Sequence, residues 1–267
     1  MGRIALIDGD MVAYRCAASC HPSKKKALDL GVPFETLEVE PLDTAIFRAN
    51  DLLYRIMDSC SADEHRVFIS GNRNYRKLLY KDYKAHRADV AKPVHLDPLR
   101  ELLAREWQAE VCDGYEADDG IGMAHSERAI IVSNDKDFKQ IEGEHYNPVK
   151  DEFEVVDSTM AAYYFYHILL KGDAADNIRG VDGIGEVRAS RILTGLSPEE
   201  MHSTVSRLYD DERRFLLNYK LVRILRSPEE YDDILRELDE TAVSESQGQE
   251  LAEEGSGGDP VSIPGVN

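Results

Sequence analysis

Apolar and polar residues alternate along most of the chain in a pattern that predicts short strands separated by amphipathic helices. Apolar runs at residues 3–8, 65–70 and 129–132 are short and bounded by charged or turn-forming residues, as buried strands are. Between the first two runs, residues 43–58 place apolar side chains at helical spacing. Because strands alternate with helices, the pattern predicts an α/β fold with a central, mostly parallel sheet.

The same pattern predicts further elements. Helices are expected at 12–18 and from Leu99 to Leu103, a small hairpin at 31–40, and a second hairpin at 145–157 that ends the sheet. A helical half begins near Tyr163 and includes two helices within 197–226. From about residue 241 the composition changes to Ser, Gly, Gln and Glu, which predicts a flexible acidic tail. We therefore expect an α/β domain at 1–157, a helical subdomain at 158–240 and a tail at 241–267.

Composition restricts the setting in which the protein works. The longest apolar run, residues 160–170, is too short to span a bilayer, and residues 3–10 read directly as a strand and its turn rather than as a signal peptide. We expect a cytoplasmic monomer with no membrane partner, in the host cytoplasm if it is phage-encoded. The cysteines form no CxxC pair, which predicts reduced thiols; Cys16, Cys20 and His21 lack the second half of a zinc site.

Charge is segregated along the chain. Of the net charge of −19, residues 229–267 contribute −11, from twelve acids and one base, which leaves −8 for residues 1–228. Residues 73–92 stand out against this background with seven bases and two acids, a local net charge of +5. A basic segment in an acidic protein can steer a polyanion to one place.

Five acids are concentrated at residues 110–138: Glu116, Asp118 and Asp119 open a predicted helix, and Asp135 and Asp137 follow the predicted strand at 129–132. One interpretation is structural, because acids are favoured in the first turns of helices and Asp135 can cap the next helix. The other is that the acids meet at one edge of the sheet and bind a divalent metal, since crowded anions without a cation are costly to bury.

The basic segment also has two interpretations. Its tyrosines, Tyr75, Tyr80 and Tyr83, are interspersed with the cations. This pattern fits an amphipathic helix with a solvated basic face. It also fits binding of single-stranded nucleic acid, in which cations neutralise phosphates and aromatic rings stack on bases.

Residues 171–193 carry a second group of candidate functional residues. Asp173 and Asp176 are spaced to share one face of a helical turn. The glycines of GVDGIG precede a predicted helix with Arg188 and Arg191, an arrangement that can bind a phosphate backbone through exposed N–H groups. The alternative is an ordinary glycine-rich connection between helices.

Five motifs in order, IDGD, RKLLYKDYKAHR, YEADD, SNDKDF and GDAADNIRGVDGIG, resemble the 5′-nuclease or flap-endonuclease family, and most of all the bacteriophage 5′→3′ exonucleases. The resemblance covers residues 4–193. It implies a PIN-like domain with a helical arch at about 72–92 and a helix-hairpin-helix-type segment at about 173–193. It also implies metal-dependent cleavage of DNA phosphodiesters at 5′ ends, flaps or junctions, in phage replication, recombination or repair.

Roles carry over from the resemblance by position. The implied metal ligands are Asp8, Glu116, Asp118, Asp119, Asp135, Asp137, Asp173 and Asp176. The implied catalytic cations of the arch are Arg76, Lys84 and Arg87. The implied DNA contacts are Arg73, Lys77, Lys81, Tyr83 (by stacking), Gly183, Ile184, Gly185, Arg188 and Arg191.

The chain departs from the family pattern at several positions. Ser70 stands where many members have an acid, so one metal is expected to have a weaker shell completed by water. Lys81 and Asp82 precede the YK pair in place of the usual proline, and Arg179 replaces another proline. Neither of the two proline changes removes an implied metal ligand.

The implied chemistry agrees with the residue types. Oxygen ligands without histidine favour two Mg²⁺ ions, replaceable by Mn²⁺, over zinc, and two such ions can activate water and stabilise the leaving 3′ oxygen, which gives a 5′-phosphate. A K⁺ ion at Gly183–Gly185 and replication proteins bound by the acidic tail are further expectations. Two alternatives stay open: a non-catalytic DNA-binding relative whose acids hold a structural ion, and a ribonuclease of the wider PIN group.

Overall fold

A six-stranded sheet forms the centre of the computed structural model, which describes residues 2–240, without the side chains of residues 88 and 89. Its strands are β1 (Ile4–Asp8), β2 (Glu64–Asn74), β3 (Glu110–Gly114), β4 (Ala129–Val132), β5 (Gly143–Asn147) and β6 (Glu152–Val156). The strand order is β3-β2-β1-β4-β5-β6, and every pair is parallel except β5–β6. The predicted α/β fold with a mostly parallel sheet is confirmed, as is the hairpin that ends it.

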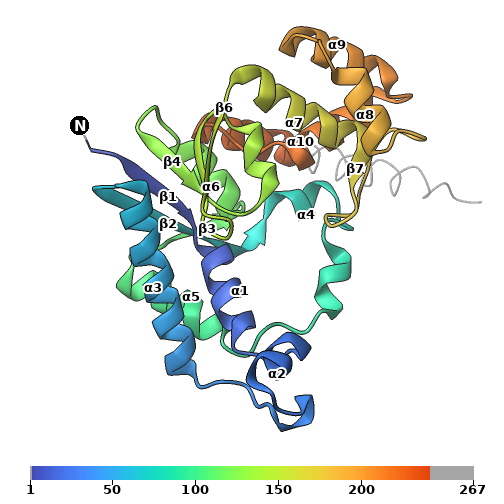
Figure 1. Ribbon diagram of the computed structural model, residues 1–267. Coiled ribbons are helices and arrows are strands. Elements are labelled where there is room, and N and C mark those ends of the chain that lie inside the picture. The colour runs from blue at the N-terminus through green and yellow to red at the C-terminus, as the bar shows by residue number, and fades with distance from the viewer. Residues whose placement is uncertain (1, 241–267) are drawn as a thin grey trace, which may run out of the picture. The chain divides into compact units, whose positions relative to one another are not determined.

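Side chains of β1 point alternately to the two faces of the sheet, and each face has its own hydrophobic core. Ala5 and Ile7 join the core under α1 (Gly9–Ser19), α3 (Leu42–Cys60) and α5 (Leu96–Glu106). Leu6 joins the opposite core, under α6 (Ala117–Ala124). Figure 1 shows α1, α3 and α5 gathered on one side of the sheet.

The helical half has a third core. It is built from α7 (Ser158–Lys171), α8 (Glu186–Leu193), α9 (Pro198–Leu208) and α10 (Glu212–Val222). A two-stranded hairpin, β7 (Gly172–Asp173) and β8 (Ile178–Arg179), joins α7 to the loop before α8. Tyr83, from the basic segment, also packs into this core, so the two halves of residues 1–227 are connected through that segment.

Three segments are less regular than the rest. The hairpin expected at 31–40 is wrong: α2 (Lys24–Leu30) is followed by a 3₁₀ turn, η1 (Phe34–Thr36), whose backbone bonds are local. Pro33 has no N–H for a ladder, and Phe34 is 43% exposed, so no buried face supports strands here. The segment predicted as the arch contains two short helical pieces, α4 (Tyr75–Leu79) and η2 (Ala85–Asp89), and η3 (Lys136–Gln140) follows β4.

The chain divides into two units, residues 1–227 and residues 228–267. The described part of the second unit, residues 228–240, is helical. The predicted tail at 241–267 lies outside the described residues, and the predicted domain boundaries stay predictions. In residues 2–240, no helix has the length and apolar character needed to cross a membrane.

Candidate active site

Acidic side chains gather where the parallel strands end. Asp8 is the last residue of β1, Asp135 follows β4, and Glu116 and Asp118 open α6 after β3. The carboxyl ends of parallel strands share one edge of a sheet, where ligands bind in open α/β folds. Local hydrogen bonds fix two of these acids: Asp8 accepts from the Met11 N–H at 2.9 Å and the Ser133 hydroxyl at 2.8 Å, and Asp135 accepts from the Asp137 N–H at 2.9 Å.

A cleft of about 590 Å³ lies at this edge, and charged side chains dominate its lining. Its acids are Asp8, Asp10, Glu116, Asp118, Asp135, Asp137, Asp173 and Asp176. Its cations are Lys84, Arg87, Arg100 and Lys136. Eight acids against four cations leave the described lining with a net charge of −4. Seven of the eight predicted metal ligands therefore line one cleft.

The β7–β8 hairpin brings Asp173 and Asp176 to the cleft from the helical half. The expected helical turn is wrong, because residues 174–177 form the turn of this hairpin. Two glycines permit it: a Cβ on Gly172 would lie 2.4 Å from the Gly180 nitrogen, and one on Gly180 would lie 2.3 Å from the Gly172 nitrogen. The two carboxylates still reach the same cleft, by a different backbone path.

Mutual repulsion and burial perturb the acids of the cleft. Burial, then Asp10 and Asp135, raise the pKa of Asp8 to about 7. Burial, then Asp135 and Asp173, raise the pKa of Asp137 to about 7. Burial, then Asp8 and Glu116, raise the pKa of Asp118 well above its ordinary value. Groups perturbed in this way are typical of functional sites.

The donor set fits hard divalent cations. All candidate ligands are carboxylates, no histidine lines the described cleft, and the buried Oδ1 atom of Asp137 has no hydrogen-bond partner among the described residues. In residues 2–240, no three acidic, histidine or cysteine side chains already surround one point closely enough to hold an ion.

All three predicted arch cations lie within ion-pair distance of an acid of the cleft: Arg76 Nη1 is 3.7 Å from Glu116 Oε2, and Lys84 and Arg87 also line the cleft themselves. The Lys84 Nζ atom lies 2.6 Å from Glu116 Oε1 and 3.6 Å from Asp176 Oδ2, and Arg87 Nη2 lies 2.7 Å from Asp176 Oδ1. Burial alone would lower the pKa of Lys84, but the Glu116 and Asp176 carboxylates raise it above its ordinary value. Lys84 is therefore a fixed positive charge in this site.

Arg76 and Asp119 are not part of the cleft, which corrects their predicted roles as arch cation and metal ligand. The two form a bidentate pair at 2.5 and 2.8 Å, with side chains 3% and 0% exposed. Arg76 also donates to the carbonyls of Leu221 and Arg223, and Asp119 accepts from the N–H groups of Glu116 and Leu225. Their charges are satisfied inside the protein, so the pair joins α4, α6 and the end of α10.

Tyr83 also has a different role from the one predicted. It is 2% exposed, so its ring packs in the core of the helical half and cannot stack on a base. Its hydroxyl donates to Glu116 Oε2 at 2.8 Å and lies 3.1 Å from Asp176 Oδ2. Tyr83 therefore orients two acids of the cleft.

The other predicted DNA contacts lie at the surface and stay predictions. Arg73 is exposed and paired with Asp113 at 2.6 Å. Lys77, Lys81, Gly183, Gly185, Arg188 and Arg191 are exposed, whereas Ile184 is buried. Gly183 has a φ of +73°, and its carbonyl accepts a hydrogen bond from Arg188 at 3.2 Å. Gly185 precedes α8, which leaves backbone N–H groups of the first turn near the surface.

Sequence reasoning missed three charged residues of the cleft: Asp10, Arg100 and Lys136. Asp10 is in the IDGD motif, but a single acid two positions after Asp8 has no distinctive spacing. Arg100 is separated from the other cleft residues in sequence and lies on a helix that reads as an ordinary amphipathic one. Asp10 and Arg100 form an ion pair, which arises only because α1 and α5 pack together in the fold.

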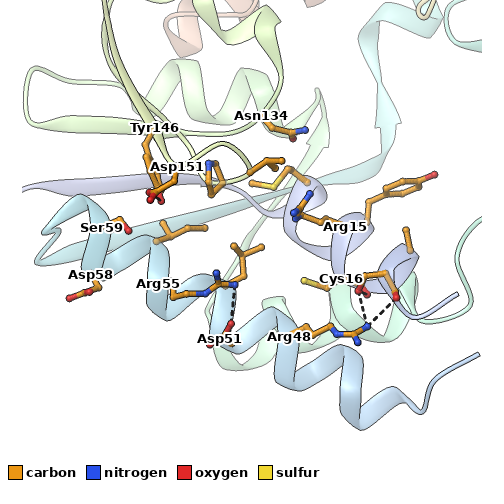
Figure 2. Close-up of a pocket in the computed structure, with 18 residues that line it drawn as sticks. Arg15, Cys16, Arg48, Asp51, Arg55, Asp58, Ser59, Asn134, Tyr146 and Asp151 are labelled. Atoms are coloured by element: carbon orange, nitrogen blue, oxygen red, sulfur yellow. Dashed lines mark hydrogen bonds and ion pairs between the residues drawn. The ribbon is translucent and has the colours of Figure 1, made fainter. Parts of the chain in front are cut away.

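A larger cavity, about 1150 Å³, lies beside α1 and α3 (Figure 2). Met11, Tyr14 and Asn134 line both this cavity and the acidic cleft. In Figure 2, Arg55 pairs with Asp51, at 2.9 Å, and Arg48 donates to Ser19, at 3.0 Å. Among the described residues of the cavity's lining, three acids (Asp51, Asp58 and Asp151) are matched by three arginines (Arg15, Arg48 and Arg55), whereas acids outnumber cations in the smaller cleft, so the chemistry is placed there.

Comparisons with known proteins agree with this arrangement. The family described as 5′-3′ exonuclease, N-terminal resolvase-like domain, matches residues 3–166. A 5′-3′ exonuclease of Buchnera aphidicola subsp. Acyrthosiphon pisum is 26% identical over 256 residues, which are 83% of this chain and 86% of that protein. A 5′-3′ exonuclease of Bacillus subtilis is 31% identical over 165 residues, 53% of each chain.

A flap endonuclease of bacteriophage T5, crystallised in a complex with DNA and metal ions, has a TM-score of 0.62 at 16% identity. The alignment covers 89% of this chain and 98% of the phage protein, and it shows a shared fold. The family match spans more than half of the chain and includes the ends of β1, β3 and β4 that carry the acids. The protein therefore belongs to the 5′-3′ exonuclease family, and its residues 3–166 match the N-terminal resolvase-like domain of that family.

Proposed function

We propose that the protein is a metal-dependent nuclease that hydrolyses DNA phosphodiesters at or near 5′ ends, as a 5′→3′ exonuclease or flap endonuclease, and leaves 5′-phosphates. The observation that carries the proposal is the cleft itself, in which seven predicted ligands and the cations Lys84 and Arg87 come together. The names of the relatives, 5′-3′ exonuclease and flap endonuclease, support the same reaction class.

The carboxylates suited to holding the ions are Asp8, Glu116, Asp118, Asp135, Asp137, Asp173 and Asp176. Bound Mg²⁺, or Mn²⁺ in its place, supplies charge neutralisation and a lowered pKa of water, the chemistry that phosphodiester hydrolysis needs at neutral pH. The acidity of the cleft gives a reason for this dependence, because its acids outnumber its cations by eight to four and, once ionised, repel a phosphate until metal ions enter.

The protein's own cations orient the scissile phosphate. Lys84 and Arg87 are held by Glu116 and Asp176, so their positions are set before the substrate arrives. Positive charge already in place stabilises the charge that develops on phosphate oxygens without reorganisation. Tyr83 fixes the acids that hold Lys84, since its hydroxyl contacts both Glu116 and Asp176.

Digestion of 5′-labelled DNA tests the proposal. In Mg²⁺, the wild-type protein is expected to release short 5′-phosphorylated products from recessed ends, or whole flaps from branched duplexes, and product length distinguishes the two modes. Asp135→Asn should lose this activity and still bind a 5′-overhang duplex in Ca²⁺, with Asp29→Asn on the exposed part of α2 as the matched control. Wild-type cleavage that persists in excess chelator would refute the metal dependence.

The rival functions make different predictions in the same assay. A non-catalytic DNA-binding relative leaves the label intact in Mg²⁺ and Mn²⁺ while still binding the duplex. A ribonuclease digests a matched RNA faster than the DNA. Comparing duplex affinity in K⁺ and in Na⁺ tests the expected K⁺ ion at Gly183–Gly185. Pull-downs with the full chain and with a variant that lacks residues 241–267 test whether the tail binds partner proteins.

A further inference from the structure

A charged pair on the α1–α5 side of the cleft has no role in the reaction described above. Arg100 of α5 donates through Nη1 to Asp10 Oδ1 and through Nη2 to the carbonyl of Ser70, within β2. The other oxygen of Asp10, Oδ2, accepts the Ser70 N–H at 2.9 Å. Asp10 and Ser70 thus hold the guanidinium at both ends.

The held guanidinium remains available to a ligand. Arg100 lines the acidic cleft, and its side chain is 27% exposed. A guanidinium has five N–H donors, and the two hydrogen bonds to Asp10 and Ser70 use two of them, so three are left within the described structure. A planar donor group already fixed in orientation loses little conformational entropy when it binds an oxyanion.

Lys84 and Arg100 are held by different elements of the cleft wall. Lys84 pairs with Glu116 at the start of α6 and with Asp176 of the β7–β8 hairpin. Arg100 of α5 is held by Asp10 of α1 and Ser70 of β2. Both cations line the same cleft, so a nucleic-acid strand bound there meets two positive charges that are fixed independently of each other.

We propose that Arg100 binds a backbone phosphate next to the scissile phosphate that Lys84 and Arg87 contact, and that Asp10 positions its guanidinium. This inference rests on the proposed function, since it assigns Arg100 to the DNA strand that the protein is proposed to cleave. It explains why Arg100 is held on two sides instead of extending into solvent. It also gives Asp10 a function distinct from that of the metal ligands.

Binding of a 5′-overhang duplex, followed by fluorescence anisotropy in Ca²⁺ at several salt concentrations, tests the role of Arg100. Arg100→Ala is expected to weaken affinity about tenfold and to lower the slope of log affinity against log salt by about one. Arg100→Lys should restore the slope and only part of the affinity, because a lysine keeps the charge without the planar fork. Arg105→Ala, an exposed arginine on the same helix, is the matched control and should bind as wild type.

The double variant Asp10→Ala/Arg100→Ala separates phosphate binding from simple neutralisation of Asp10. If Arg100 contacts DNA, the double variant stays about as weak as Arg100→Ala. Recovery of wild-type affinity in the double variant, or an unchanged affinity and salt slope in Arg100→Ala, would overturn the proposal.

Two controls keep the result interpretable. Arg100→Gln, which retains hydrogen-bonding groups, replaces Arg100→Ala if thermal unfolding shows that the alanine variant is not folded, and it should show the same loss of salt slope. Wild-type protein that neither binds nor cleaves DNA would instead refute the proposed function. The two failures are therefore distinguishable.

Discussion

At the scale of single residues, burial decides the role of each cation in the basic segment. Arg76 is 3% exposed and bound to Asp119 within the protein, whereas Lys84 is 18% exposed and paired with acids that line the cleft. Both have the same charge and lie eight positions apart in the same motif. Removing Arg76 should therefore affect stability, and removing Lys84 should affect the reaction.

We expect Lys84→Ala to lower kcat by about 10²–10³-fold at saturating DNA, because a positive charge fixed beside the reacting phosphate is lost. Single-turnover cleavage in Mg²⁺ measures this rate. Lys25→Ala, at an exposed position of α2, is the control. If only KM rises, and the rate at saturation is that of the wild type, Lys84 only attracts the polyanion.

We expect Arg76→Ala to lower the free energy of unfolding by about 3–5 kcal/mol, because it leaves the Asp119 carboxylate buried without its partner. Denaturant unfolding followed by circular dichroism measures the change. Lys77→Ala should stay close to wild type. A loss of less than about 1 kcal/mol would mean that water reaches Asp119 in the variant.

At the scale of elements, close packing of α6 on the sheet positions two acids of the cleft. Gly120 lies in α6, and a Cβ at that position would come within 2.6 Å of Cys112 Sγ and 2.8 Å of the Phe68 ring. Glu116 and Asp118 lie within one turn of this contact. The distance between helix and sheet therefore controls where the two carboxylates stand.

Gly120→Ala is expected to push α6 away from the sheet and to cost about 1–3 kcal/mol of stability through overpacking. Cleavage should also fall, because Glu116 and Asp118 move with the helix. Adding Cys112→Ala removes one of the two contacts and should recover part of both losses. Stability and single-turnover rate are measured on the same samples, and unchanged values of both would contradict this account.

At the scale of the whole molecule, the proposed metal binding in the cleft would be coupled to folding. The cleft brings together carboxylates from β1, α6, η3 and the β7–β8 hairpin, which are far apart in sequence. Their mutual repulsion therefore destabilises the folded state in which they share the cleft. Ions that bind only the folded form stabilise it in proportion to their occupancy. The site therefore links the α/β half to the helical half through electrostatics.

Without metal, stability should fall as pH rises from about 4 to about 7. Asp8 and Asp137 have a folded-state pKa of about 7, above the ordinary value near 4, so the folded chain binds more protons than the unfolded chain in this window. The stabilising contribution of these two groups is complete below the unfolded-state pKa, near 4, and is lost as the pH rises through the folded-state pKa of about 7. Thermal unfolding in chelator measures this slope; Asp137→Asn should reduce it, and saturating Mg²⁺ should reverse it. A metal-free slope unaffected by Asp137→Asn would exclude Asp137 as a cause.

The amino-acid sequence by itself determined the alternation of strands and helices over most of the chain and the family motifs. These depend on local periodicity and on short spacings, which the chain carries whatever its tertiary contacts. The positions of Asp8 and Asp135 in one cleft follow from the rule that parallel strands end at the same edge, whereas Asp173 and Asp176 reach it through the β7–β8 hairpin, which the sequence did not predict.

Only the tertiary structure decided which charges face the cleft. Asp118 and Asp119 are neighbours in one motif, yet the helix turns the first to the cleft and the second to Arg76 in the interior. Tyr83 is buried because the helical half packs over it, and Arg100 meets Asp10 because α5 packs against α1. Burial and pairing depend on contacts between residues distant in sequence, and no local pattern records those contacts.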